Sequence, residues 1–245
     1  MGEIKVLMDP ERREKYVSEL FELEGWQSVT EDANAAYCPI SLTSTPKKLK
    51  PYLKGRQEML KNVLRRSGIT SYDPSDSRAY SPDFDGDANP GDVYNFDSRK
   101  VAEARYFTGH LIIPTMGVGT EMEKARTLNK IAVALVDDGI RISRMLPSRV
   151  IYLKYSDFGE EMYRFVPVFD MLRRFEPGMG LNDGKPVLLG FERDSGRVVD
   201  LGEEVFEEFP ELTFSYRKGT PLMELECTNM ELIRGSLTAR VLHPD

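Results

Sequence analysis

The sequence predicts an α/β protein: a Rossmann-like or flavodoxin-like parallel sheet flanked by helices, with a β-rich C-terminal appendage. Three observations support this class. An apolar run at 107–114, two glycines, a helical segment and a second apolar run at 131–136 follow in the order of a βαβ unit. The chain has 245 residues, 40% of them hydrophobic, which is enough for a full core. After residue 177, hairpin patterns replace helical ones.

The first half of the expected catalytic domain alternates strand and helix. Residues 34–41 are typical of a short buried strand, and a helix is expected from Pro51 to about Arg66, with leucines at helical spacing. Residues 75–92 are rich in Asp, Pro, Gly and Ser, which indicates a long loop. A helix at about 92–106 then leads into the strand at 107–114.

The second half repeats this alternation. We expect a glycine turn at 116–119, a helix from Glu121 to about Asn129, strands at 131–136 and 150–155, and a helix at about 160–175. Beyond Pro177, a hairpin is expected at 186–193 and 197–201, with strand-like runs at 212–217 and 222–227. These patterns divide the chain into an N-terminal extension (1–33), a catalytic domain (34–176) and an appendage (177–245).

Composition excludes several kinds of protein. The net charge is −7, no run approaches about 18 apolar residues, and the first residues lack a secretory signal, so we expect a cytoplasmic protein without membrane contact. The chain has only two cysteines and two histidines, far apart in sequence, which rules out the common zinc motifs. It also lacks the GxSxG elbow that carries the nucleophilic serine of a Ser-His-Asp triad in α/β-hydrolases. We therefore expect no metal and no cofactor, and carboxylates as the agents of any chemistry.

Two charged segments call for interpretation. Residues 46–68 hold eight Lys and Arg against one Glu, which favours a solvated helix face, with attraction of an anionic partner as the alternative. Asp83, Asp85 and Asp87 suggest a calcium loop, but position 6 would be Ala88 and position 12 Tyr94. The register of a calcium loop therefore fails.

Residues 114–125, PTMGVGTEMEKA, are the sharpest local motif. Gly117 and Gly119 lack the third glycine of a dinucleotide fingerprint, yet they permit close approach of a sugar or phosphate to a helix N-terminus. Glu121 follows as a candidate nucleophile, its pKa held down by the N–H groups of the helix start. The alternative is purely structural, a capping box formed by Thr120 and Glu123 with an acid in the first turn.

Asp97 is the candidate partner of Glu121. It shares a helix face with Val93, Val101 and Ala104, so its carboxylate falls on the side expected to pack on the sheet. A desolvated Asp with a raised pKa could exchange a proton near pH 7, and two unequal carboxylates suit glycosidic-bond cleavage. The alternative is that Asp97 is the N-cap of a shorter helix.

These residues resemble the nucleoside 2-deoxyribosyltransferase-like family, and within it the 2′-deoxynucleoside 5′-phosphate N-hydrolases and related nucleotide N-glycosidases. The resemblance covers about residues 34–176 and rests on the motif at 114–125 with the following Asn129 and Lys130. It implies that Glu121 is the nucleophile that takes the sugar C1′, that Asp97 assists proton transfer at the leaving base, and that Tyr37 orients Glu121. A homo-oligomer is expected by the same analogy.

The resemblance also implies a set of substrate-binding residues. Thr115 and Ser143 match the hydroxyls that bind a 5′-phosphate, although either could be an ordinary turn hydroxyl. Two positions depart from the family: residues 39–44, PISLTS, replace a glycine-rich phosphate loop, and Glu123 replaces a glycine. The expected substrate-binding residues are Thr115, Gly117, Val118, Gly119, Ser143 and Ser41.

The function expected from the sequence is cleavage of the N-glycosidic bond of a nucleoside or nucleotide, with the sugar passing to water or another base. A nucleotide-binding module without catalysis, acting through its appendage, is the alternative. Nucleic-acid binding through the basic segment ranks last, because the chain as a whole is acidic and the segment lacks interleaved aromatic residues beyond Tyr52.

Overall fold

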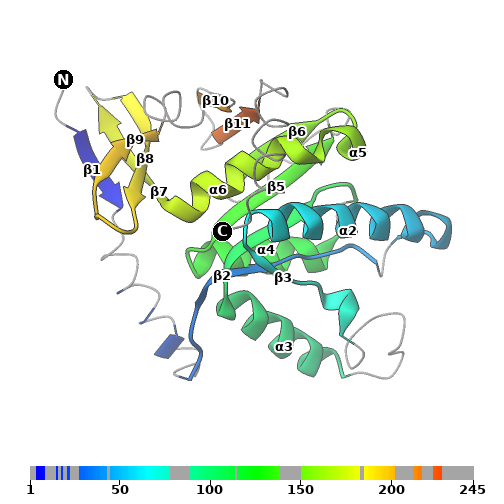
Figure 1. Ribbon diagram of the computed structural model, residues 1–245. Helices are drawn as coiled ribbons and strands as arrows, with labels where there is room; N and C mark the ends of the chain where they lie inside the picture. The colour runs from blue at the N-terminus through cyan, green and yellow to red at the C-terminus, as the bar shows by residue number, and fades with distance from the viewer. Residues whose placement is uncertain are drawn as a thin grey trace.

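A seven-stranded sheet with the strand order β10-β11-β6-β5-β4-β2-β3 forms the centre of the molecule. All its neighbouring strands pair in parallel except β10 and β11, which are antiparallel. Figure 1 shows this arrangement in a computed structural model. The structure describes residues 4–8, 15, 18, 21–22, 28–42, 45–77, 89–113, 115–137, 150–182, 185–201, 212–216 and 223–227. The fold is α/β, as the sequence predicts.

Helices and strands alternate along most of the main sheet. Its strands are β2 (Asp32–Tyr37), β3 (Thr70–Tyr72), β4 (Ala104–His110), β5 (Ile131–Asp137), β6 (Val150–Tyr155), β10 (Leu212–Tyr216) and β11 (Met223–Cys227). The α-helices are α2 (Lys50–Arg66), α3 (Pro90–Glu103), α4 (Met116–Thr127), α5 (Phe158–Glu161) and α6 (Val166–Arg174). Short 3₁₀ helices lie at η1 (Lys47–Leu49), η2 (Pro74–Asp76) and η3 (Met162–Phe165).

The helices cover the two faces of the sheet in separate cores. On one face α3 and α4 pack over Tyr37 and Phe107, and on the other α2, α5 and α6 pack over Cys38 and Tyr106. Because the side chains of consecutive strand residues point to opposite faces of the sheet, they pack in different cores. The parallel register sets Tyr37 beside Phe107 and Tyr72, at the carboxyl edge of the sheet where ligands of such folds bind.

A second, antiparallel sheet has the order β1-β7-β8-β9. It comprises β1 (Ile4–Met8), β7 (Phe175–Asn182), β8 (Lys185–Glu192) and β9 (Val198–Asp200), and it lies beside the N-terminus in Figure 1. The predicted hairpin therefore exists, and a strand of the N-terminal extension joins the same sheet. The predicted strands near 212–217 and 222–227 also form, at the edge of the main sheet. The division into three domains stays a prediction.

Several element boundaries differ from those expected. The strand predicted at 107–114 begins at Ala104 and ends at His110, and the helix before it begins at Pro90, where the Asn89 side chain accepts a hydrogen bond from the N–H of Gly91 at 2.8 Å. The single helix predicted at 160–175 is instead α5, η3 and α6 in succession. The helix at 51–66 and the strands at 131–136 and 150–155 are confirmed within one residue.

The amino edge of the main sheet is held by a buried ion-pair network. Lys130, whose side chain is 0% exposed, donates to Glu31 at 2.6 Å and to the carbonyl of Ala102 at 2.7 Å. Arg105 pairs with Glu31 at 2.8 Å and also with Glu176 of β7. The network therefore ties β2, β4 and β5 to the second sheet. Within the described part of the chain, no helix combines the length and apolar character that crossing a bilayer requires.

Candidate functional site

Three predicted residues meet at the carboxyl edge of the sheet. Tyr37 is the last residue of β2, Glu121 lies in the second turn of α4, and Asp97 is in the middle of α3. The hydroxyl of Tyr37 donates a hydrogen bond to Oε1 of Glu121 at 2.8 Å. The same hydroxyl also interacts with Asp97, whose Oδ1 is buried without a hydrogen-bond partner among the described residues.

The electrostatics of Glu121 differ from the expectation. Burial, with a smaller contribution from the charge of Asp97, raises its pKa to about 8 against the opposing effect of the hydrogen bond from Tyr37. The predicted lowering by helix N–H groups is wrong, because α4 begins five residues earlier and Glu121 lies beyond its first turn. Glu121 therefore holds a proton at neutral pH in the free protein.

Asp97 has the raised pKa that the sequence predicts. Burial brings the pKa to about 6, with the Tyr37 hydrogen bond acting in the opposite direction. The alternative of an N-cap is excluded, since α3 runs from Pro90 to Glu103 and Asn89 is its cap. With pKa values near 6 and 8, the pair of carboxyls carries one proton between these pH values.

The capping box predicted at Thr120 and Glu123 does not form. Thr115 is the N-cap of α4, and its hydroxyl accepts from the N–H of Val118 at 3.4 Å. Glu123 instead pairs with Arg126 on the exposed side of the helix. The glycines that suggested a turn lie in the first helical turn, where a Cβ at Gly117 or Gly119 would meet nothing within 4 Å.

The other predicted binding residues are partly brought together. The Ser41 and Thr115 hydroxyls lie 3.2 Å apart, and the Ser41 hydroxyl also donates to the carbonyl of Ile113 at 3.2 Å. Val118 is buried, and Gly117 and Gly119 are exposed beside it. Ser143 lies outside the described residues, as do the loop aspartates Asp83, Asp85 and Asp87.

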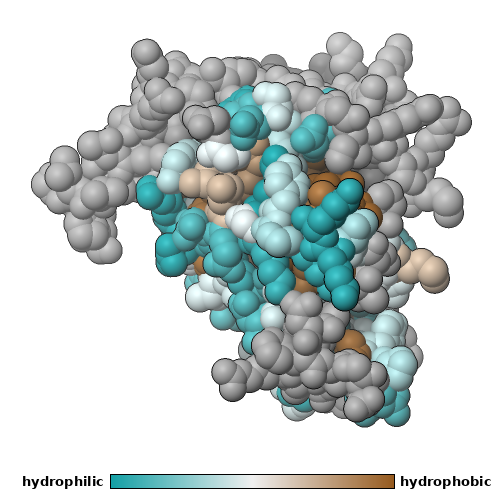
Figure 2. Space-filling model, turned by 90° about the vertical axis from the view of Figure 1, so that its right-hand side faces the viewer, coloured by the Kyte–Doolittle hydropathy of each residue, from teal (hydrophilic) through white to brown (hydrophobic). Residues whose placement is uncertain are grey.

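A small hollow of about 10 Å³, roughly the room that one water molecule needs, adjoins this site on the α2 side of the sheet edge. Its lining residues are Pro39, Ile40, Ser41, Leu53, Gln57, His110, Ile112 and Ile113. Figure 2 views the molecule from the side toward which β2 runs in Figure 1, and the described surface there is mostly hydrophilic, with apolar side chains visible in the gaps. The sequence did not predict this hollow.

The basic segment is not uniformly solvated. Arg56 turns inward, with its guanidinium carbon 4.7 Å from the Tyr52 ring centroid and 5.0 Å from that of Tyr155. Its position three residues after Leu53 and four before Leu60 places it at the border of the buried stripe, which is a signal the sequence contains. Lys54 and Arg65 are exposed.

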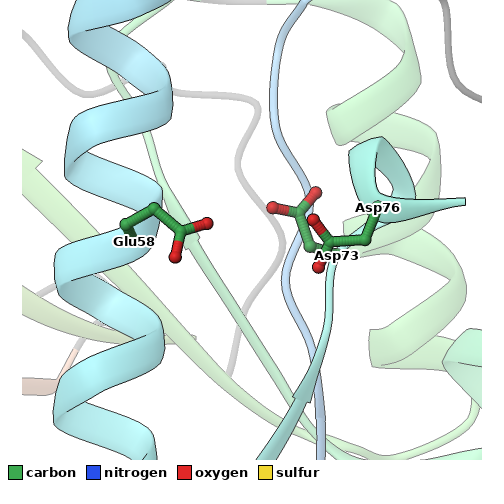
Figure 3. A group of neighbouring side chains, drawn as sticks. All are labelled: Glu58, Asp73 and Asp76. Carbon is green, nitrogen blue, oxygen red and sulfur yellow. The ribbon is translucent and has the colours of Figure 1, made fainter.

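An acidic cluster at the end of β3 is neutralised in part by the ammonium group of Lys61. Figure 3 shows Glu58 of α2 facing Asp73 and Asp76 of the segment around η2. Lys61 Nζ lies 2.8 Å from Glu58, 3.1 Å from Asp73 and 2.8 Å from Asp76. The ammonium group occupies the place that a metal ion would take, so the cluster ties η2 to α2.

Comparisons with known proteins identify only a distant structural likeness. No known family's sequence profile matches the chain, and no curated protein matches it in sequence. Among solved structures, the chain is similar to the CMP N-glycosidase BcmB of Clostridium botulinum, with 18% identity and a TM-score of 0.40. This match covers 54% of the chain and 97% of BcmB. A likeness of this size assigns neither a family nor an activity.

Proposed function

We propose that the chain cleaves the N-glycosidic bond of a nucleoside or nucleoside 5′-monophosphate through a covalent bond between the sugar and Glu121. The observation that supports this most directly is the 2.8 Å hydrogen bond from the Tyr37 hydroxyl to Glu121, with the buried Asp97 beside it. A carboxylate nucleophile and a second carboxyl with a raised pKa are the two groups that glycosidic cleavage with a covalent intermediate needs.

The proposed reaction uses the single proton that the carboxyl pair holds. In the free protein this proton is on Glu121, so it first passes to Asp97. Glu121 is then ionised, and Tyr37 holds its Oε1 while Oε2 attacks C1′. The bond from C1′ to the base nitrogen breaks as Asp97 gives its proton to the departing base. Water, deprotonated by Asp97, or a second base then attacks C1′ and releases the Glu121 carboxylate.

This scheme predicts a bell-shaped dependence of kcat/KM on pH. Below about pH 6 both carboxyls are protonated and no nucleophile is available, and above about pH 8 both are ionised and no acid remains. We expect the two limbs near these values in assays of base release by chromatography. A flat profile from pH 5 to pH 9 would contradict the proton-sharing scheme.

Glu121→Ala tests the nucleophile directly. Base release from a panel of nucleosides and monophosphates should fall at least ~10³-fold. Glu123→Ala is the matched control, because Glu123 lies on the same helix, is exposed and pairs only outward with Arg126, so its activity should be unchanged. Full activity of Glu121→Ala would overturn the proposal, and an adduct of a 2-fluoro sugar analogue in intact-mass spectra would support it.

Two further measurements distinguish transfer, hydrolysis and binding without catalysis. Incubating one nucleoside or nucleotide with a foreign free base distinguishes transfer from hydrolysis, because only a transferase incorporates the new base. Thermal stabilisation by a nucleotide without any turnover would instead favour the binding module.

A further inference from the structure

Gln57 is a polar residue at a core position of α2. The residue is 2% exposed and belongs to the buried stripe of this helix, whose other members are Leu53, Leu60, Val63 and Leu64. Burying an amide costs free energy unless protein hydrogen bonds replace those with water, and a leucine at this position would avoid that cost. Core packing alone therefore does not explain a glutamine here.

The Gln57 side chain reaches the end of β2. Its Nε2 donates a hydrogen bond of 2.7 Å to the carbonyl of Cys38, which directly follows Tyr37, where the pairing of β2 with β4 ends. The N–H of Cys38 donates to the carbonyl of Tyr72 at 2.8 Å. Pro39 comes next and has no N–H with which to extend the ladder. Gln57 therefore supplies a donor at the point where the chain leaves the sheet.

Residues 38–41, here called the exit segment, lead from the end of β2 toward the start of α4. At its far end the hydroxyl of Ser41 lies 3.2 Å from that of Thr115, the N-cap of α4. Pro39 packs so closely on Gly109 of β4 that a Cβ there would lie 2.9 Å from Pro39 Cγ. The exit segment therefore contacts α2, β4 and the start of the helix that carries the proposed nucleophile.

We propose that Gln57 is a positioning residue of the candidate active site, which holds the carbonyl of Cys38 and thereby directs the Tyr37 hydroxyl toward Glu121. The hydrogen bonds at the N–H and the carbonyl of Cys38 fix the peptide planes on both sides of this residue. The Tyr37 hydroxyl lies at the far end of a long side chain, so a small backbone rotation is enough to break its 2.8 Å hydrogen bond. The role of Gln57 in catalysis rests on the proposed function, whereas its effect on the Glu121 carboxyl does not.

Gln57 can influence the titration of Glu121 only through the position of Tyr37. It carries no charge and lies on the α2 side of the sheet, whereas Tyr37 packs in the core on the other side. The ionisable groups that face Glu121 are Tyr37 of β2 and Asp97 of α3, and Tyr72 of β3 faces Tyr37 in turn. A change at Gln57 that reaches Glu121 therefore reports on the hydrogen bond between Tyr37 and Glu121.

Titration of the Glu121 carboxyl by ¹³C NMR, in the full chain without substrate, tests the proposal. Because the hydrogen bond from Tyr37 lowers the pKa of Glu121, its loss should raise that pKa. We expect a rise of about 0.5 unit in Gln57→Met, which keeps the length of the side chain without the donor, and a similar rise in Gln57→Leu. Val63→Ala is the matched control, since it changes a buried residue of the same helix, and the pKa of Glu121 should stay within about 0.1 unit.

A double-mutant cycle separates positioning from a general structural role. In Tyr37→Phe the hydroxyl is absent, so adding Gln57→Met should raise the pKa of Glu121 no further. An unchanged pKa in Gln57→Met would overturn the proposal, and so would an equal rise with and without the Tyr37 hydroxyl. Both Gln57 variants should also melt at a lower temperature, because the carbonyl of Cys38 loses its donor. Lower melting with an unmoved pKa would assign Gln57 to stability alone.

Kinetics connect this positioning to catalysis. The kcat of base release should fall about threefold in Gln57→Met with KM unchanged, because Tyr37 contacts Glu121 rather than the substrate. Both limbs of the pH profile should move to higher pH, since Tyr37 also interacts with Asp97. A loss confined to KM would contradict the positioning role. Should the wild type release no base from any substrate, the proposed function fails, while the NMR cycle still decides whether Gln57 positions Tyr37.

Discussion

The two edges of the same parallel sheet treat buried charge in opposite ways. At the amino edge, Lys130 and Arg105 share the carboxylates of Glu31 and Glu176. At the carboxyl edge, Glu121 and Asp97 have raised pKa values, and among the described residues Oδ1 of Asp97 is buried without a hydrogen-bond partner. The ion pairs at the amino edge stabilise the fold. The buried carboxyls at the carboxyl edge are electrostatically unfavourable in the free protein, and a bound ligand could offset that cost. Substitutions should therefore have opposite consequences at the two edges.

Lys130→Met at the amino edge should have the largest effect on stability. It removes a fully buried ammonium from Glu31 and from the carbonyl of Ala102, and breaking such a pair costs about 3–5 kcal/mol. Urea denaturation measures this loss, while kcat/KM per folded molecule should stay within about twofold. Arg126→Met removes an exposed pair with Glu123 and should cost only about 0.5 kcal/mol. Equal costs in the two variants would remove the distinction between paired and exposed charge.

Glu121→Gln at the carboxyl edge should stabilise the protein at high pH. The folded protein binds a proton at Glu121 up to about pH 8, whereas the unfolded chain releases it near pH 4.5, so wild-type stability falls as the pH rises between these values. The variant lacks this loss. Its advantage should be near zero at pH 4.5 and reach up to about 5 kcal/mol at pH 9, the same order as the loss in Lys130→Met. A difference that stays constant from pH 5 to pH 9 in urea denaturation would contradict the burial of an ionisable group.

The sequence predicts the meeting of Tyr37, Asp97 and Glu121 because each lies at a fixed place on an element that periodicity reveals. The predicted start of α4 is wrong because Gly117 and Gly119 suggest a turn, yet glycine is tolerated in an exposed first turn that Thr115 caps. Because this start would place Glu121 in the first turn, the sequence predicts a lowered pKa for Glu121, whereas burial raises it.

Other properties depend on tertiary packing and leave little trace in the sequence. The depth at which Glu121 is buried depends on how α4 packs against Tyr37, a contact between residues 84 positions apart. Arg56 stands at the border of the apolar stripe of α2, but only the fold shows that His110 and Tyr155 face it. The roles of all these residues and the expected homo-oligomer stay predictions.

Tyr37→Phe at the carboxyl edge should have a moderate effect on activity, about tenfold at pH 7. The Tyr37 hydrogen bond lowers the pKa of both Asp97 and Glu121, so its removal should move both limbs of the pH profile to higher pH, by about one unit. Chromatographic assays across pH 5 to pH 10 measure the limbs. Lower activity with unmoved limbs would mean that Tyr37 acts on the substrate rather than by positioning and tuning the carboxyls.

The smallest expected effect returns to the amino edge, at the turn that delivers Lys130 to its partner. Asn129 has a φ of 54°, in the left-handed region that costs most side chains about 1–2 kcal/mol but that Asn and Gly adopt readily. Asn129→Ala should therefore lose about 1 kcal/mol and Asn129→Gly less than about 0.5 kcal/mol, both with unchanged kcat/KM. Equal losses in urea denaturation would show that the Asn129 side chain, rather than the backbone angle, holds the turn. A loss of activity in either variant would show that the two edges are coupled through α4, which begins at the candidate site and ends at this turn.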